Sequence, residues 1–216
     1  MSNDTTSQEQ VWALLQEKLP YAKTDTDKEK RNEQWSKIDV NGNGYLSLAE
    51  VDKGMRDVLD LPLLFDIKPV LMRAFQAAKN VAPSSSSSRG DDYIQRSEYR
   101  LLLQYLRQYY ELWLAFAQID SDSDRRISYQ EFETTKDTLA QWGIDMSDPE
   151  AQWKECDKNG GGMVLFAEFC DWAIHKNLDL EGDDDWWILF YRYTHTHMST
   201  AFLNKMHISQ VLLHTQ

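Results

Sequence analysis

The sequence predicts an all-α protein of two lobes, each a pair of helix–loop–helix units joined by a short β-bridge. An oxygen-rich stretch of the chain, residues 39–50, lies between two segments whose apolar residues have helical spacing. Similar stretches recur at 120–131 and 157–168. Each stretch also carries an apolar residue at its eighth place, where paired loops of this kind form a short strand against each other.

The first stretch, DVNGNGYLSLAE, matches the calcium loop of an EF-hand, which places oxygen ligands at positions 1, 3, 5, 7, 9 and 12. The expected ligands are the side chains of Asp39, Asn41, Asn43 and Ser47, the backbone carbonyl of Tyr45, and both carboxylate oxygens of Glu50. Gly44 at position 6 permits the sharp turn with positive φ. The alternative, a surface turn rich in glycine and asparagine, does not account for the helical segments on both sides.

The two later stretches are imperfect copies of the first. In 120–131 the expected ligands are Asp120, Asp122, Asp124, the carbonyl of Arg126, Ser128 and Glu131. Arg125 at position 6 is a flaw, because a left-handed backbone costs a non-glycine residue roughly 1–2 kcal/mol. In 157–168 the expected ligands are Asp157, Asn159, the carbonyl of Met163, and Glu168. Gly161 and Leu165 leave positions 5 and 9 without side-chain oxygens, so water has to fill both places.

The pairing of loops predicts one more helix–loop–helix unit, the second along the chain, so that 120–131 is the third loop and 157–168 the fourth. Ile127 and Val164 are partners at position 8 of the last two loops, and Leu46 needs a partner of its own. Ile94, with Glu98 four places further on, is the best candidate. This pairing predicts a degenerate hand that keeps the EF-hand fold and has lost the calcium ion. A simple linker is the alternative at this place.

The expected elements follow in order along the chain. Helices are predicted over 11–19, before the first loop, over 51–59 with Pro62 closing it, over 66–80, over 98–119, after the third loop around Phe132 and Leu139, and on both sides of the fourth. The organisation is a disordered segment 1–10, an EF-hand pair 11–98 with a serine-rich insert in its degenerate hand, a second pair 99–182, and an atypical apolar-aromatic tail 183–216. The tail either folds back onto the hands, docks to a partner or a membrane interface, or extends beyond the natural end.

Composition excludes several classes of function. The net charge of −12 argues against nucleic acid as a partner, because phosphates attract a basic face. No stretch reaches the roughly 20 apolar residues of a membrane-spanning helix. The two cysteines suggest reduced thiols in a cytoplasmic protein. No P-loop, nucleophile motif or HExxH motif is present, so an enzyme is not expected.

Over residues 11–182 the chain resembles the calflagins, acidic calcium-binding proteins of the trypanosomatid flagellum. The resemblance is carried by the order of intact and degraded hands, by the helix EYRLLLQYLRQYYEL and by the connector at 141–145. It implies a flagellar or ciliary location. Members of that family carry N-terminal acylation, whereas Ser2 stands where N-myristoylation requires glycine, so this chain as written is not expected to carry that anchor.

Calcium is the expected ligand, and a calcium sensor is the expected function. The first and third loops are predicted to be occupied, and the fourth to be the weakest of the three intact loops. Calcium draws in the position-12 glutamate and swings the exiting helix, which exposes an apolar groove for a protein target or a membrane surface. Candidate groove residues are Met55, Met72, Met146 and Met163, which could equally fill the core. A calcium buffer and a structural component of a flagellar or ciliary assembly remain alternatives.

Overall fold

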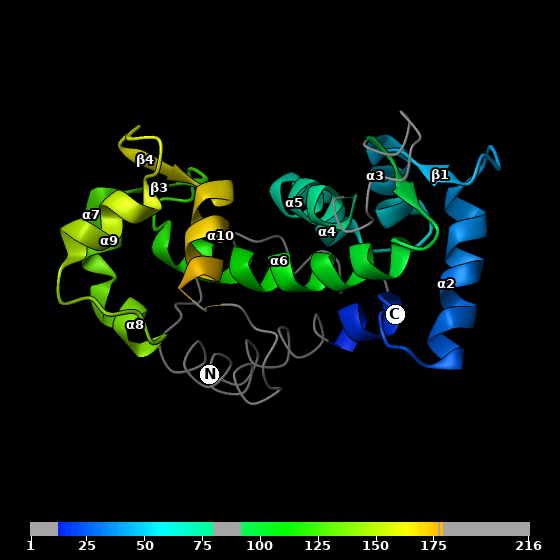
Figure 1. Ribbon diagram of the computed structural model, residues 1–216, viewed down its shortest axis with the longest axis horizontal. Coiled ribbons are helices and arrows are strands. Elements are labelled where there is room, and N and C mark those ends of the chain that lie inside the picture. Colours follow the sequence, from blue (N-terminus) through cyan, green and yellow to red (C-terminus); the bar gives the residue numbers. More distant parts are fainter. Residues whose placement is uncertain (1–12, 80–91, 177, 179–216) are drawn as a thin grey trace. The chain divides into compact units, whose positions relative to one another are not determined.

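The computed structural model describes residues 13–79, 92–176 and 178, and their regular structure is helical apart from two short antiparallel β-ribbons (Figure 1). This confirms the all-α class and the short bridges. The structure separates into two compact units, and the division falls between Tyr110 and Glu111. Helix α6 (Tyr99–Ile119) therefore begins in the first unit and ends in the second. Residues 1–10, the serine run and the apolar tail segment 186–191 lie outside the described residues.

The first unit follows the predicted helix–loop–helix order. After helical residues 13–18 come α2 (Asp25–Ile38), β1 (Tyr45–Leu46), α3 (Leu48–Asp57), α4 (Pro62–Asp66), α5 (Lys68–Lys79), β2 (Ile94–Gln95) and the first part of α6. The Thr24 side chain caps α2 by accepting a hydrogen bond from the Asp27 backbone N–H. Ser47 caps α3 in a capping box with Glu50. The last residue of the first calcium loop thus lies in the first turn of the helix that leaves it.

Pro62 does not close the exiting helix of the first loop, contrary to the prediction. Helix α3 ends at Asp57, and Pro62 instead occupies the first turn of the extra helix α4. Proline is favoured there because its fixed φ suits a helix start, where the missing N–H has no partner to lose. The next entering helix, α5, accordingly begins at Lys68.

The pairing of loops is confirmed in both units. Strands β1 and β2 are antiparallel with Leu46 opposite Ile94, and both side chains are fully buried. The predicted partner of the first loop is therefore the segment that ends at Glu98, and the linker alternative is wrong. In the second unit the register places Ile127 opposite Val164.

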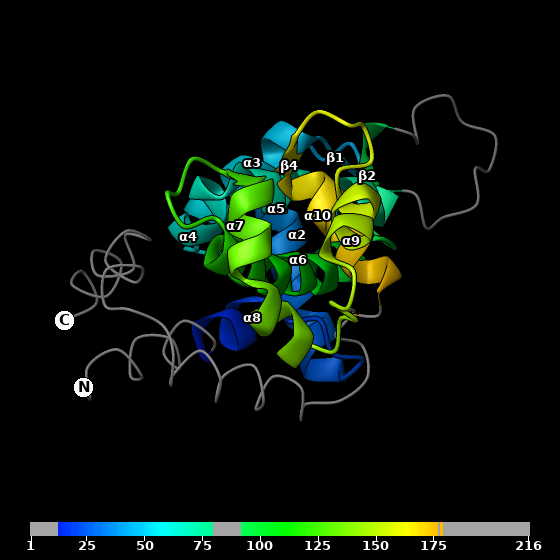
Figure 2. The same cartoon turned by 90° about the vertical axis from the view of Figure 1, so that its left-hand side faces the viewer.

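The second unit contains the end of α6 and both later loops. Its elements are β3 (Arg126–Ser128), α7 (Tyr129–Thr134), α8 (Lys136–Gln141), α9 (Pro149–Cys156), β4 (Met163–Leu165) and α10 (Phe166–His175), which Figure 2 shows from the side. The helix leaving the third loop is broken at Thr135. Its hydroxyl donates to the carbonyls of Glu131 and Phe132, a backward bond that commonly bends helices.

An aromatic cluster fills the core of the second unit. Phe132 contacts the rings of Trp153 and Trp172 edge to face, at centroid distances of 5.5 and 5.6 Å. Phe116 of α6 contacts Phe169 of α10 in the same way. Phe116 of the long helix is thus a core residue, as predicted for its aromatic residues, whereas Trp113 is partly exposed. None of the helices in the described residues is long and apolar enough to cross a membrane.

Candidate functional site: the paired loops

In the first loop a network of hydrogen bonds joins the predicted ligand residues of 39–50. The Asp39 carboxylate accepts from the backbone N–H groups of Asn43 and Gly44 at 3.1 and 3.0 Å. Glu50 faces it across the loop and accepts from Asn41 Nδ2 through Oε1 and from the Ser47 N–H and hydroxyl through Oε2. Position 1 and position 12 are therefore held by opposite ends of the loop, as a hard cation with oxygen ligands requires.

Position 7 of each loop lies on a strand of the β-bridge. Tyr45, Arg126 and Met163, the residues predicted to supply backbone carbonyls, belong to β1, β3 and β4. The Tyr45 N–H donates to Asn43 Oδ1, and the Arg126 N–H donates to Asp124 Oδ1, each at 2.8 Å. The position-5 side chain is thus tied to the position-7 backbone by a local bond that fixes the curvature of the loop.

The third loop concentrates negative charge. Carboxylate oxygens of Asp120, Asp122 and Asp124 lie within 4.8 Å of one another. The Asp124 N–H donates to both Asp120 and Asp122, at 3.1 and 3.0 Å, which holds the three residues together. A cluster of three carboxylates at this spacing offers the charge and the oxygens of a calcium site.

The backbone of the third loop carries a second flaw that the sequence analysis missed. Arg125 at position 6 has φ of 69°, as expected for that position. Ser123 at position 4 also has a positive φ, 62°, where the first and fourth loops have Gly42 and Gly160. The sequence signal for this flaw is the serine at position 4 of the third loop, where the other two loops have glycine. Two left-handed residues without glycine make the third loop the most strained of the three.

The electrostatics of the third loop differ between its two ends. Burial, together with the nearby charge of Glu131, raises the pKa of Asp120 to about 6, although hydrogen bonds from backbone N–H groups oppose the shift. Burial also acts to raise the pKa of Glu131, but hydrogen bonds from Ser128 and Ser121 outweigh it and lower that pKa. A divalent cation would favour the ionised form of both groups.

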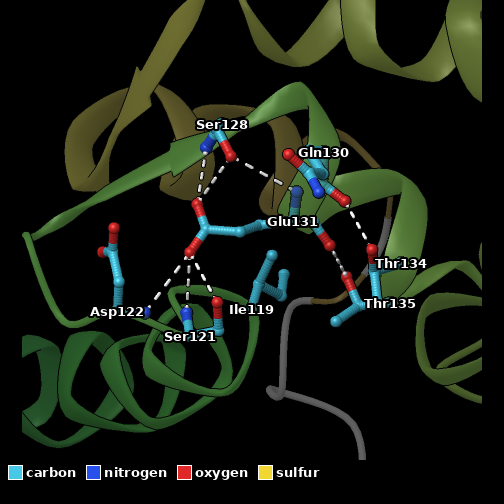
Figure 3. Close-up of a pocket in the computed structure, with 8 residues that line it drawn as sticks. All are labelled: Ile119, Ser121, Asp122, Ser128, Gln130, Glu131, Thr134 and Thr135. Carbon is cyan, nitrogen blue, oxygen red and sulfur yellow. Dashed lines mark hydrogen bonds between the residues drawn. The ribbon is translucent and has the colours of Figure 1, made fainter.

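Glu131 stands on the wall of a cavity of roughly 300 Å³ beside the third loop (Figure 3). Its Oε1 accepts from the N–H and hydroxyl of Ser121, both at 2.9 Å, and its Oε2 accepts from the N–H and hydroxyl of Ser128. Because Ser121 stands at position 2, these bonds tie the two ends of the loop together. The cavity thus borders the position-12 carboxylate and the first turn of the exiting helix.

The fourth loop keeps its geometry and lacks ligands. Asp157 accepts from the N–H groups of Gly161 and Gly162 at 2.9 and 2.8 Å, and Asn159 Nδ2 donates to Glu168. Asn159 and Glu168 thus contact each other, while Asp157 holds the glycine turn of the same loop. Leu165 at position 9 is 51% exposed and carries no oxygen, which agrees with the expected weakness of this site.

One contact recurs in all four hands. The backbone N–H at position 9 donates to Oε2 of the position-12 glutamate: Ser47 to Glu50, Gln95 to Glu98, Ser128 to Glu131 and Leu165 to Glu168, at 2.7 to 3.2 Å. Glu98 is only 3% exposed although its hand is degenerate. The glutamate at this position therefore stabilises the start of the exiting helix whether or not an ion is bound.

The methionines named as groove candidates fall into two groups. Met55 is fully buried in the first unit, which agrees with a core role. Met72 and Met163 are 53% and 41% exposed, and Met146 is partly exposed. Cys156 and Cys170 are both buried and form no disulfide, and burial raises the pKa of the Cys156 thiol.

Comparison with known proteins is consistent with this geometry. A family model described as the FCaBP EF-hand domain matches residues 15–106. The chain is 33% identical over 175 residues to the flagellar calcium-binding protein of Trypanosoma cruzi. The aligned stretch covers 81% of this chain and 83% of that protein. It is 32% identical over 182 residues to the flagellar calcium-binding protein TB-24 of Trypanosoma brucei brucei, which covers 84% of each.

Proposed function

The chain belongs to the flagellar calcium-binding protein family, the calflagins, and from this premise we propose that it is an EF-hand calcium sensor of the flagellum. The observation that carries the proposal is the convergence of ligand residues in the first and third loops. Each of these loops belongs to a different unit, so each unit has one loop with oxygens at all the side-chain ligand positions.

The first and third loops are the calcium sites of this proposal. The first has glycine at both left-handed positions and two carboxylates, from Asp39 and Glu50. The third has four carboxylates, which strengthen binding, and two strained backbone positions, which weaken it. The fourth loop binds more weakly, because two of its ligand positions lack an oxygen.

The position-12 glutamates supply the conformational signal. Glu50 lies in the first turn of α3 and Glu131 in the first turn of α7, each within a capping box. An ion that draws either carboxylate toward the loop must also move the start of the exiting helix. Sensor EF-hands use this movement to expose an apolar groove, and the proposed partner of that groove is a protein target or a membrane surface.

Calorimetric titration with calcium tests the proposal when position-12 variants are compared. Wild type should show two sites with dissociation constants of roughly 10⁻⁷–10⁻⁵ M. Glu50→Gln and Glu131→Gln should each lose one site. Glu98→Gln, the same substitution in the degenerate hand, is the matched control and should keep both. If Glu50→Gln and Glu131→Gln bind as wild type does, calcium is not held by these loops.

An apolar-surface dye read during the same titration separates a sensor from a buffer. A calcium-dependent rise in dye binding supports an exposed docking surface. Calcium binding without a dye response favours a buffer that opens little. Absence of binding at millimolar calcium would leave the hands as a scaffold for protein contact, the structural alternative.

A further inference from the structure

Residues 13–22, here called the N-terminal strap, pack on the first unit through contacts that the calcium loops do not require. Leu15 and Leu19 are each only 1% exposed, so the strap contributes to the core of this unit. Its helical part lies at the end of the unit opposite the paired strands β1 and β2 (Figures 1 and 2). That is the end at which an EF-hand pair opens when its helices move apart.

Side chains of helix α2 donate hydrogen bonds to the backbone carbonyls of the strap. Arg31 Nη1 donates to the carbonyl of Pro20 at 2.6 Å and to that of Ala22 at 2.7 Å. Gln34 Nε2 donates to the carbonyl of Lys18 at 2.9 Å. These charged and amide donors fix the non-helical end of the strap to the helix that leads directly into the first calcium loop.

Helix α6 holds the same stretch from a second side. Arg100 Nη1 donates to the carbonyl of Tyr21 at 3.4 Å. The Arg107 guanidinium bonds the Tyr21 hydroxyl and lies 5.0 Å from the centre of its ring, a cation–π contact. Tyr21 is therefore held at its backbone, its ring and its hydroxyl by one helix.

These two helices belong to different hands of the pair. Helix α2 enters the first loop, whereas α6 leaves the degenerate hand directly after Glu98. The Lys18 ammonium also lies 4.0 Å from Asp60, which follows the exiting helix α3. The strap thus bonds α2 and α6 and also reaches Asp60 beyond α3, so a swing of α3 relative to α2 would break this set of contacts.

We propose that the N-terminal strap is an autoinhibitory contact, which holds the first EF-hand pair closed and is released when calcium binds the first loop. The inference rests on the proposed calcium site of that loop. Coupling between two sites is reciprocal, so calcium weakens the hold of the strap by the same factor by which the strap weakens calcium binding. A target of the first unit would then compete with a segment of this chain.

Thiol reactivity at position 19 measures release directly. In the full chain with Leu19→Cys, the rate of reaction with a thiol reagent should rise about fivefold or more when calcium is added. The exposed neighbour, in the Glu17→Cys variant, should react at the same rate with and without calcium. The native thiols, Cys156 and Cys170, are buried, and the wild type gives their background. Adding Glu50→Gln to Leu19→Cys should abolish the calcium effect.

Calorimetry of Arg31→Met tests the reciprocal effect without touching the core. Methionine keeps a long stem and removes both bonds to the strap, so calcium should bind the first loop about fivefold or more tightly. Lys30→Met, an exposed change of the same charge on the same helix, should leave the affinity unchanged.

The outcomes separate failure of the strap from failure of the calcium site. Equal affinities in Arg31→Met and Lys30→Met would overturn the strap alone. The same holds if calcium leaves the thiol reactivity of the Leu19→Cys variant unchanged while Glu50→Gln still loses a site. If Glu50→Gln loses no site, the calcium site of the first loop is itself wrong, and the strap proposal falls with it.

Discussion

Replacing Arg125 with glycine tests the backbone strain of the third loop. Arg125 has φ of 69°, and a left-handed backbone costs a side-chain-bearing residue about 1–2 kcal/mol. Glycine also increases the conformational entropy of the unfolded chain, which offsets about 0.4–1 kcal/mol of the stability gained by removing the strain. The expected net effect is therefore a gain of about 0.5–1 kcal/mol in the free energy of unfolding. At the equivalent Gly44 and Gly162 an added Cβ would meet no atom within 4 Å, so the cost at this position lies in the backbone.

Denaturant unfolding at saturating calcium measures this gain, and Arg125→Ala is the matched control. Alanine removes the same charge as glycine and keeps the Cβ atom that causes the strain. The Arg125 backbone N–H bonds Asp120 at 3.0 Å and persists in both variants. We expect Arg125→Gly to exceed wild type by the stated amount and Arg125→Ala to stay near wild type.

A gain of equal size in both variants would refute this reasoning. It would show that the charge of Arg125, and not its backbone conformation, limits the third loop. If neither variant differs from wild type, the positive φ carries no cost there and the loop is not strained.

Three further predictions concern the ligands and their scaffold. Burial raises the pKa of Asp120 to about 6, so near and below pH 6 calcium must displace a proton, and the calcium affinity of the third loop should fall there. Without calcium, the stability that protonation of Asp120 contributes is present below the ordinary pKa of an aspartate and should be lost as pH rises from that value through 6. Calorimetry at pH 6 in buffers of different ionisation enthalpy should detect the released proton, and no release would contradict the assignment. Gly161→Asp should strengthen calcium binding by the fourth loop, because it adds a carboxylate at position 5. Asn159 Oδ1, 2.5 Å from the new Cβ, has to move aside. An unchanged number of sites in calcium titration would argue against this prediction. Glu98→Ala should lower the free energy of unfolding by about 1–3 kcal/mol, since the Gln95 N–H loses its acceptor, which thermal unfolding measures. The same variant should leave the calcium stoichiometry unchanged, which calcium titration measures.

The pairing of hands was predictable because it depends on a local rule. An apolar residue at position 8 of one loop requires another opposite it, and this was enough to select Ile94 as the partner of Leu46. The ligand sets were predictable for a similar reason, since the loop imposes its own spacing. Side chains within one such loop meet whatever the rest of the chain does.

The features that escaped prediction depend on distant or weak signals. The N-terminal strap is bound by Arg100 and Arg107, which lie 79 and 86 residues from Tyr21 in the chain, and no periodicity reports such contacts. The break at Thr135 arises from one hydroxyl that competes for helix carbonyls, and threonine is common within helices that do not break. The role of Pro62 was ambiguous, because proline both follows helices and starts them.

The arrangement of good and poor loops has a physical logic within each unit. In the first unit an intact loop pairs with one whose hand is degenerate, and in the second a strained, acidic loop pairs with one that lacks two oxygens. The poorer partner still supplies a strand and a position-12 glutamate that holds the start of its exiting helix. The fold therefore needs the pairing of Leu46 with Ile94, and the Glu98 contact, even where a hand has lost its calcium ligands. A hand that is predicted to have lost its ion therefore still contributes to the fold, through the strand that pairs with the neighbouring loop and the glutamate at the start of its exiting helix.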